Sequence, residues 1–130
     1  MLVLVDTSVW IEFLDRFNPA VRDELATLLR TNRVATAGIV LAELRQGCRS
    51  PAQVKTVLEM MEPLAYCEVN WGTWLHAGQL VAEGSSRGMS LDLGDCLLAA
   101  LAMREDYSVF TLDRDFQRIS GLKLYGPRVN

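Results

Sequence analysis

Four acidic residues, far apart in the sequence, are the strongest candidates for chemistry: Asp6, Glu43, Asp95 and Asp113. Asp6 directly follows the apolar run Leu2–Val5, and Asp113 follows a second apolar run, Ser108–Leu112. Carboxylate oxygens are the ligands that Mg²⁺ and Mn²⁺ prefer, and these ions need neither histidine nor cysteine. If the four side chains meet in one pocket, they predict a site for a divalent cation.

A reaction without a metal lacks the necessary groups. His76 is the only histidine, and it falls in the middle of a predicted helix, far in sequence from the acids. Neither Ser8 nor any cysteine has an evident histidine partner that would make it a nucleophile. Crowded carboxylates would also repel one another, so that one or more would hold a proton until a cation arrived. The acids are therefore expected to act through a bound metal.

Each acid also has an ordinary structural interpretation. Asp6 could end a strand in a turn, and Glu43 could face solvent beside an arginine. Asp92 could cap a helix, with Asp95 reaching back in an arrangement like a capping box. Asp113 could cap the last helix. These interpretations stay open one by one, but together they do not explain why four acids gather where the fold would place a pocket.

The apolar patterns predict short strands that alternate with helices. Strands are expected at Leu2–Val5, Val34–Ala37, Leu64–Val69 and Ser108–Leu112, with an edge strand at Lys123–Tyr125. Helices are expected to start after Asn18-Pro19 and Ser50-Pro51, where the first residue caps the helix and proline opens it. Further helices are expected over Gly38–Gln46 with Gly47 as its stop, from Trp74 toward Arg87, over Asp92–Arg104, and briefly at Phe116–Ile119. This alternation implies right-handed crossovers and a parallel sheet between helices, the α/β class. Ligands bind beyond the carboxyl ends of such strands, where Asp6 and Asp113 fall.

Length and composition set limits on the class of protein. A chain of 130 residues with 50% hydrophobic and 22% charged residues predicts a single domain over residues 1–130. The net charge of −3 argues against a broad basic surface for nucleic acid, but a metal-loaded acidic pocket would reverse the charge locally. Neither a signal peptide nor a membrane span is expected. Cys48, Cys67 and Cys96 are interpreted as reduced core thiols of a cytoplasmic protein.

Four sequence motifs occur in order along nearly the whole chain: Val5–Trp10 (VDTSVW), Leu41–Gly47 (LAELRQG), Asp95–Ala102 (DCLLAALA) and Phe110–Phe116 (FTLDRDF). Together they resemble the PIN-domain nucleases, and most of all the VapC toxins of toxin–antitoxin pairs. The resemblance implies a PIN-like three-layer sandwich with a central, mainly parallel twisted sheet flanked by helices. It also implies a Mg²⁺- or Mn²⁺-dependent endoribonuclease, a homodimer, and inhibition by a small antitoxin protein.

The resemblance also implies roles for the acids. Asp6, Glu43 and Asp95 would hold the metal directly or through water, and Asp113 would complete the shell or position a second ion. Asp115 is an accessory candidate. Asp92 competes with Asp95 for the role of ligand, and the Ala99-Ala100 pair four residues after Asp95 favours Asp95.

Other side chains near the motifs are candidates for supporting roles. Thr7, Ser8 and Thr111 could orient the carboxylates by hydrogen bonding or merely satisfy turn backbone. Arg45 and Arg114 could contact RNA phosphates or simply be solvated. The tryptophans could stack on bases, although packing in the core or a dimer is favoured; they are Trp10, Trp71 and Trp74.

Other functions remain open for an α/β chain of this kind. One is a phosphoacceptor domain, but Asp6 stands alone here, without a second early acid beside it or a lysine on the late strand. Another is a non-catalytic regulatory module with an unused acidic patch. A third keeps the nuclease and changes its role, to RNA processing or DNA cleavage.

Overall fold

The computed structural model describes residues 1–15 and 18–126. Its strands are β1 (Val3–Val5), β2 (Val34–Ala37), β3 (Ala65–Cys67) and β4 (Ser108–Phe110). Its helices are α1 (Thr7–Asp15), α2 (Pro19–Arg30), α3 (Gly38–Gln46), α4 (Pro51–Met61), α5 (Trp71–Ser86) and α6 (Leu93–Glu105), with a 3₁₀ helix, η1 (Arg114–Arg118). The predicted α/β class is confirmed.

The strands form one parallel sheet in the order β3-β2-β1-β4. Val5 at the end of β1 pairs with Phe110 at the end of β4. The residues that follow these two strands therefore emerge side by side at one edge of the sheet. The expected edge strand at Lys123–Tyr125 is reduced to a single parallel bridge, between Leu124 and Val109.

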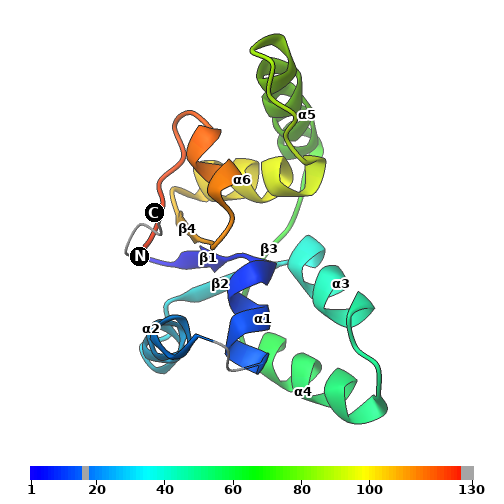
Figure 1. The fold of residues 1–130 in the computed structure, drawn as a ribbon, viewed down its shortest axis with the longest axis vertical. Coiled ribbons are helices and arrows are strands. Elements are labelled where there is room, and N and C mark those ends of the chain that lie inside the picture. Colours follow the sequence, from blue (N-terminus) through cyan, green and yellow to red (C-terminus); the bar gives the residue numbers. More distant parts are fainter. Residues whose placement is uncertain (16–17, 127–130) are drawn as a thin grey trace.

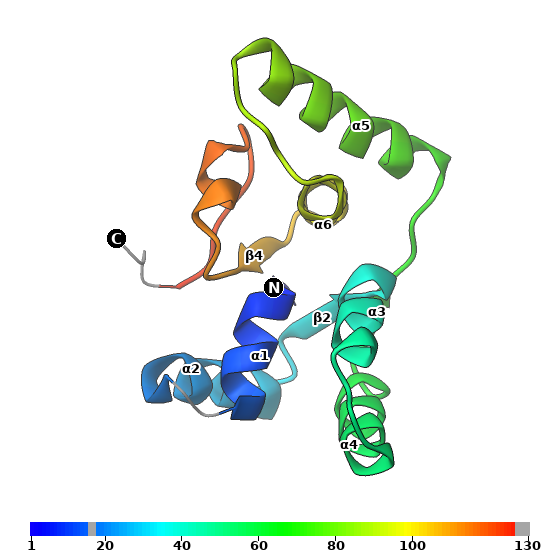
Figure 2. The same ribbon diagram turned by 45° about the vertical axis from the view of Figure 1, so that its right-hand side comes forward.

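Helices cover both faces of the sheet, which confirms the three-layer arrangement. Helices α1, α2 and α4 lie on one side, and α5 and α6 lie on the other (Figures 1 and 2). Strand β1 is buried along its whole length, as a strand covered on both faces must be. Helix α6 has seven consecutive buried residues from Cys96 to Ala102, so its nearly unbroken apolar sequence reflects burial on all sides. No helix among the described residues is both long and apolar enough to cross a bilayer.

The predicted helix starts follow the expected capping chemistry. The side chain of Asn18 accepts a hydrogen bond from the Val21 backbone N–H, and Ser50 does the same for Gln53. A proline stands at the start of both helices, where a missing N–H costs nothing. Gly47 does end α3, but with φ of −81°, so the left-handed conformation typical of a glycine stop is not used.

Helix α1 was missed by the sequence analysis, which expected at most a turn after Asp6. Instead the Asp6 carbonyl accepts the first helical hydrogen bonds, from the Val9 and Trp10 backbone N–H groups. Val9 and Trp10 are fully buried, and Phe13 and Leu14 follow on the same side of the helix four residues later. The helical spacing of these apolar residues was present in the sequence, but Asp6, Thr7 and Ser8 before them were interpreted as a turn. Trp10 belongs to the core, as favoured, whereas Trp71 and Trp74 are exposed.

Candidate active site

Asp6 lies between β1 and α1 and is almost completely buried, at 7% exposure. Its Oδ2 accepts two hydrogen bonds, from Ser8 Oγ and from Thr111 Oγ1, both 2.8 Å long. The Asp6 backbone N–H donates to the Phe110 carbonyl at 2.9 Å. The first and last sequence motifs are thus joined through a single carboxylate.

The two hydroxyl groups are themselves held by the backbone after β4. Ser8 Oγ accepts from the Leu112 N–H, and Thr111 Oγ1 accepts from the Asp113 N–H, both at 3.0 Å. Each hydroxyl has one proton, and in both cases it is committed to Asp6 Oδ2. Both anchors end on Oδ2, so Oδ1 is the oxygen of Asp6 that the network leaves available for another ligand.

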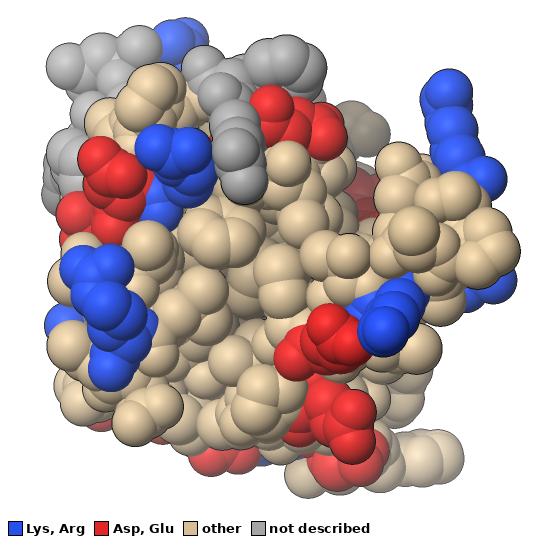
Figure 3. All heavy atoms as spheres, turned by 90° about the horizontal axis from the view of Figure 1, so that it is seen from below, with Lys and Arg blue, Asp and Glu red and all other residues tan. Residues whose placement is uncertain are grey.

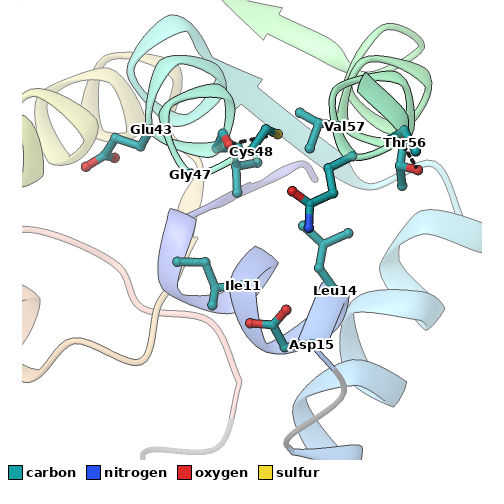
Figure 4. A pocket seen from close by; sticks show the side chains of 11 residues that line it. Ile11, Leu14, Asp15, Glu43, Gly47, Cys48, Thr56 and Val57 are labelled. Carbon is teal, nitrogen blue, oxygen red and sulfur yellow. Dashed lines mark hydrogen bonds between the residues drawn. The ribbon is translucent and has the colours of Figure 1, made fainter. Parts of the chain in front are cut away.

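Glu43 is brought to the same region by α3. Its Oε1 accepts a hydrogen bond of 2.8 Å from Thr7 Oγ1 at the start of α1. The carboxylate points away from Thr56 and Val57 on α4 (Figure 4). The hydroxyl residues Thr7 and Ser8, adjacent in sequence, therefore each hold a different acid.

The structure separates the roles of Asp92 and Asp95. Asp92 Oδ2 accepts a hydrogen bond of 3.1 Å from the Asp95 backbone N–H, so Asp92 is the cap of α6. Asp95 returns no capping-box bond among the described residues, so its carboxylate is not needed for the cap.

Asp113 caps the 3₁₀ helix η1, because its Oδ1 accepts a hydrogen bond of 2.9 Å from the Asp115 N–H. Asp115 lies 4.0 Å from the Arg118 guanidinium, measured from Oδ1 to Nη1.

The electrostatics of Asp95 indicate that the acids share one region. Burial, as the largest cause, and the neighbouring carboxylates of Asp6, Asp113, Asp92 and Glu43, in that order of effect, together raise the pKa of Asp95 from 3.8 to about 7. All three other acids proposed from the sequence are therefore close enough to Asp95 to oppose its ionisation. A cation placed among them would relieve this repulsion.

The acids do not close tightly around one point. Within residues 1–15 and 18–126, no group of three or more His, Cys, Asp or Glu side chains is arranged to hold a metal ion. The available donors are all oxygens, which suits Mg²⁺ or Mn²⁺, and Mg²⁺ usually keeps several waters and takes only one or two protein carboxylates. The residues fit such an ion if water supplies the remaining ligands. The assignment of individual ligands stays a prediction.

The remaining candidates lie outside this network. Arg45 and Arg114 are exposed and form no ion pair with a described residue. His76 lies on α5, an element that contributes none of the acids.

A groove beside Glu43 was not foreseen from the sequence. It has a volume of about 480 Å³, and α1, α3 and α4 line it (Figure 4) with Ile11, Leu14, Leu44, Cys48, Ala52 and Val57. We refer to it as the apolar groove. It was missed because one of its walls is α1. The signal in the sequence was Ile11, an apolar residue that falls outside the helical spacing of Val9, Trp10 and Phe13. In the structure its side chain is 46% exposed.

Comparisons with known proteins agree with this architecture. The family model described as "PIN domain" matches residues 3–122. Ribonuclease VapC2 of Rickettsia felis is 25% identical over 129 residues, covering 95% of this chain and 96% of that protein. The structure of DNA-bound VapBC from Salmonella typhimurium has a TM-score of 0.81 at 26% identity, covering 96% of this chain and 98% of that one. A toxin–antitoxin complex from Klebsiella pneumoniae has a TM-score of 0.75 at 19% identity, covering 92% and 94%.

Proposed function

This chain belongs to the PIN-domain family, and on that premise we propose that it is a divalent-metal-dependent endoribonuclease. The observation that carries the proposal is the convergence of the acids: hydroxyl groups hold Asp6 and Glu43 in place, and these two acids and Asp113 lie close enough to Asp95 to raise its pKa. An acid cluster that is unfavourable by itself is what a cation site requires. The likeness to a protein named Ribonuclease VapC2 supports RNA as the substrate.

Asp6, Glu43 and Asp95 hold the metal in this proposal, and Asp113 completes its surroundings. The ion would lower the pKa of a water molecule and stabilise charge on the phosphoryl oxygens of the substrate. The protein's contribution is to fix the carboxylates. Ser8 and Thr111 hold Asp6 through Oδ2, so Oδ1 would be the oxygen available to the ion, and Thr7 holds Glu43. Asp115 remains an accessory candidate.

We further propose that the protein is the toxin of a type II toxin–antitoxin pair in the cytoplasm. Support comes from the likeness to VapBC and other toxin–antitoxin complexes over nearly the whole chain. The free thiols of Cys48, Cys67 and Cys96 agree with a reducing compartment. In this reading the apolar groove beside Glu43 receives a segment of the antitoxin.

A homodimer is also part of the proposal. Trp71, Trp74 and Leu75 at the start of α5 are 81%, 53% and 61% exposed. Large apolar side chains clustered on one helix turn favour burial against another protein. A second copy of the chain is the partner that would bury them on both sides at once.

The direct test is to incubate the purified protein with a panel of labelled single-stranded RNA, double-stranded RNA and DNA, in EDTA, Mg²⁺ or Mn²⁺. We expect cleavage of RNA only when metal is present. Asp6→Asn and Asp95→Asn should each lower the rate at least about a hundredfold while leaving the fold intact. Cleavage in EDTA, or an undiminished rate in either variant, would contradict the metal mechanism. Cleavage of DNA alone would retain the nuclease and reject the RNA substrate.

A further inference from the structure

The cations of this chain differ in how far they are already neutralised. Ion pairs with acids involve Arg22, Lys55, Arg104, Arg118 and Lys123. Arg33 donates to the Met1 carbonyl and lies over the Tyr125 ring, and Arg30 donates to Thr27. Among the described residues, four arginines have neither an ion pair nor a side-chain hydrogen bond: Arg45, Arg49, Arg87 and Arg114. All four are exposed.

Two of these free arginines share one hollow. Arg45 and Arg49 line a depression of about 500 Å³ at the junction of α3 and α4, together with Cys48, Ser50, Pro51 and Val54. No carboxylate is among these lining residues. We call it the Arg45–Arg49 hollow. Two positive charges facing one space without a counter-charge are unfavourable, and an anion between them would remove that repulsion.

The hollow is connected to the candidate active site along the surface. Cys48 lines both the Arg45–Arg49 hollow and the apolar groove, and Glu43 stands at the wall of that groove. A third free arginine, Arg114, directly follows Asp113. The fourth, Arg87, caps the C-terminal end of α5, a helix that carries none of the proposed acids. Arg45, Arg49 and Arg114 therefore lie on or shortly after α3 and at the start of η1, the elements where Glu43 and Asp113 stand.

A polyanionic substrate needs such local cations on this protein. The net charge is −3, and the acids gather where the reaction would occur, so a nucleic acid strand is repelled except where Lys or Arg is free. On the face shown in Figure 3, the basic side chains form separate groups at the two sides, with a wide uncharged area between them. Arginine suits such a site, because its planar guanidinium binds phosphate through two parallel hydrogen bonds.

We propose that the Arg45–Arg49 hollow binds a backbone phosphate of the RNA substrate on one side of the bond that is cut. This inference rests on the proposed ribonuclease function and adds to it the path of the strand. RNA is favoured over an acidic protein segment because the hollow is an open, exposed cationic surface, whereas the adjoining apolar groove is the one that would bury side chains.

The test measures binding of a fluorescent single-stranded RNA by anisotropy, in Mg²⁺ and over a range of KCl, with Asp95→Asn as a non-cutting parent. Arg45→Gln and Arg49→Gln are added singly and together, and Arg87→Gln is the matched control on a free arginine that does not line the hollow. We expect each test substitution to raise Kd about three- to tenfold, and the double substitution to reduce the slope of log Kd against log [KCl] by about 0.7, the value for one phosphate on a single strand. Arg87→Gln should change neither quantity.

Cleavage by the protein that retains Asp95 separates this inference from the function on which it rests. With Arg45→Gln and Arg49→Gln together, KM should rise while kcat stays unchanged, because neither residue is in the acid cluster. An unchanged Kd and slope in the double variant, or a loss no greater than that of Arg87→Gln, would overturn the hollow as an RNA site while cleavage stands. In that case an acidic segment of a partner protein becomes its remaining occupant. Absence of RNA cleavage by the unsubstituted protein would instead remove the proposed function itself.

Discussion

Asp95 shows what gathering acids does to a single residue. Its pKa, raised to about 7 by burial and by four neighbouring carboxylates, means that the folded chain holds a proton that an exposed aspartate loses near pH 4. Asp6 is in a different position, because Ser8 and Thr111 both donate to its Oδ2. Hydroxyl donors stabilise the carboxylate of Asp6, whereas neighbouring charges oppose the ionisation of Asp95. Two acids in the same region therefore have different electrostatic environments. The sequence predicted that crowded acids would retain a proton and that nearby hydroxyls could hold them, but not which acid would have which partner, because that depends on which side chains become neighbours.

Replacing Asp95 should stabilise the protein in a pH-dependent way when metal is absent. Between pH 4 and pH 7 the folded state binds a proton that the unfolded state has released, so the free energy of unfolding falls as pH rises and levels off above pH 7. Asp95→Asn removes this effect. In EDTA the variant should melt at a higher temperature than the parent at pH 8, and the difference should shrink toward pH 5. A parent that is the more stable of the two at pH 8 would show that Asp95 is not under this repulsion.

Thr111 offers a second test at this scale. Thr111→Val keeps the shape of the side chain and removes the hydroxyl that links Asp6 to the Asp113 backbone. We expect the free energy of unfolding to fall by about 1–3 kcal/mol and Mn²⁺ affinity to fall about tenfold or more, as measured by urea denaturation and calorimetric titration. Thr111→Ser restores the donor and should recover the affinity. If valine lowers stability but leaves Mn²⁺ affinity unchanged, the hydroxyl has only a structural role.

Among the secondary-structure elements, those with clear local signals were predicted well. Asparagine or serine before proline marked the starts of α2 and α4, and an apolar run marked the buried α6. Asp6 and Asp113 could be placed at one edge because the carboxyl ends of neighbouring parallel strands must meet there. Glu43 and Asp95 could not be placed in this way, because they project from helices whose rotation about their own axes is set by packing. Helix α1 and the apolar groove beside it were missed together.

The cap of α6 gives a prediction at the scale of an element. Asp92→Ser keeps a side-chain oxygen that can accept from the Asp95 N–H, whereas Asp92→Ala loses it. Asp92→Ala should cost about 1 kcal/mol of stability, and Asp92→Ser should cost much less. If Asp92 only caps the helix, Asp92→Ser also keeps its Mn²⁺ affinity. A large loss of Mn²⁺ binding in Asp92→Ser would instead make Asp92 a ligand.

Considered as a whole, the molecule brings the candidate acids Asp6 and Asp113 to one edge of a four-stranded parallel sheet and leaves several other surfaces open. The match of the family model to residues 3–122 shows that this arrangement is that of the PIN-domain family. From composition we expect a single small domain without a broad basic face. The sequence left open whether Trp71 and Trp74 pack in the core or in a dimer, because a tryptophan on an amphipathic helix is usually buried; the structure leaves both exposed.

Those aromatics predict the assembly state. Trp71→Ser combined with Trp74→Ser should convert a dimer to a monomer in sedimentation equilibrium, because the substitutions remove the largest exposed apolar side chains of α5. Ile11→Ser, on the other side of the sheet and in the apolar groove, is a control that should leave the mass unchanged. A parent protein that is monomeric at high concentration, or a double variant that stays dimeric, would contradict the proposed interface.

The central claim is that acids from β1, α3, α6 and the end of β4 surround a single cation. The most direct measurement is anomalous diffraction from crystals soaked in Mn²⁺. The account predicts an anomalous peak bounded by Asp6 and Asp95, with Asp6 Oδ1 at an oxygen–metal distance of about 2.1 Å and with Glu43 and Asp113 reached directly or through water. A peak at another place, or no peak at saturating Mn²⁺, would contradict it.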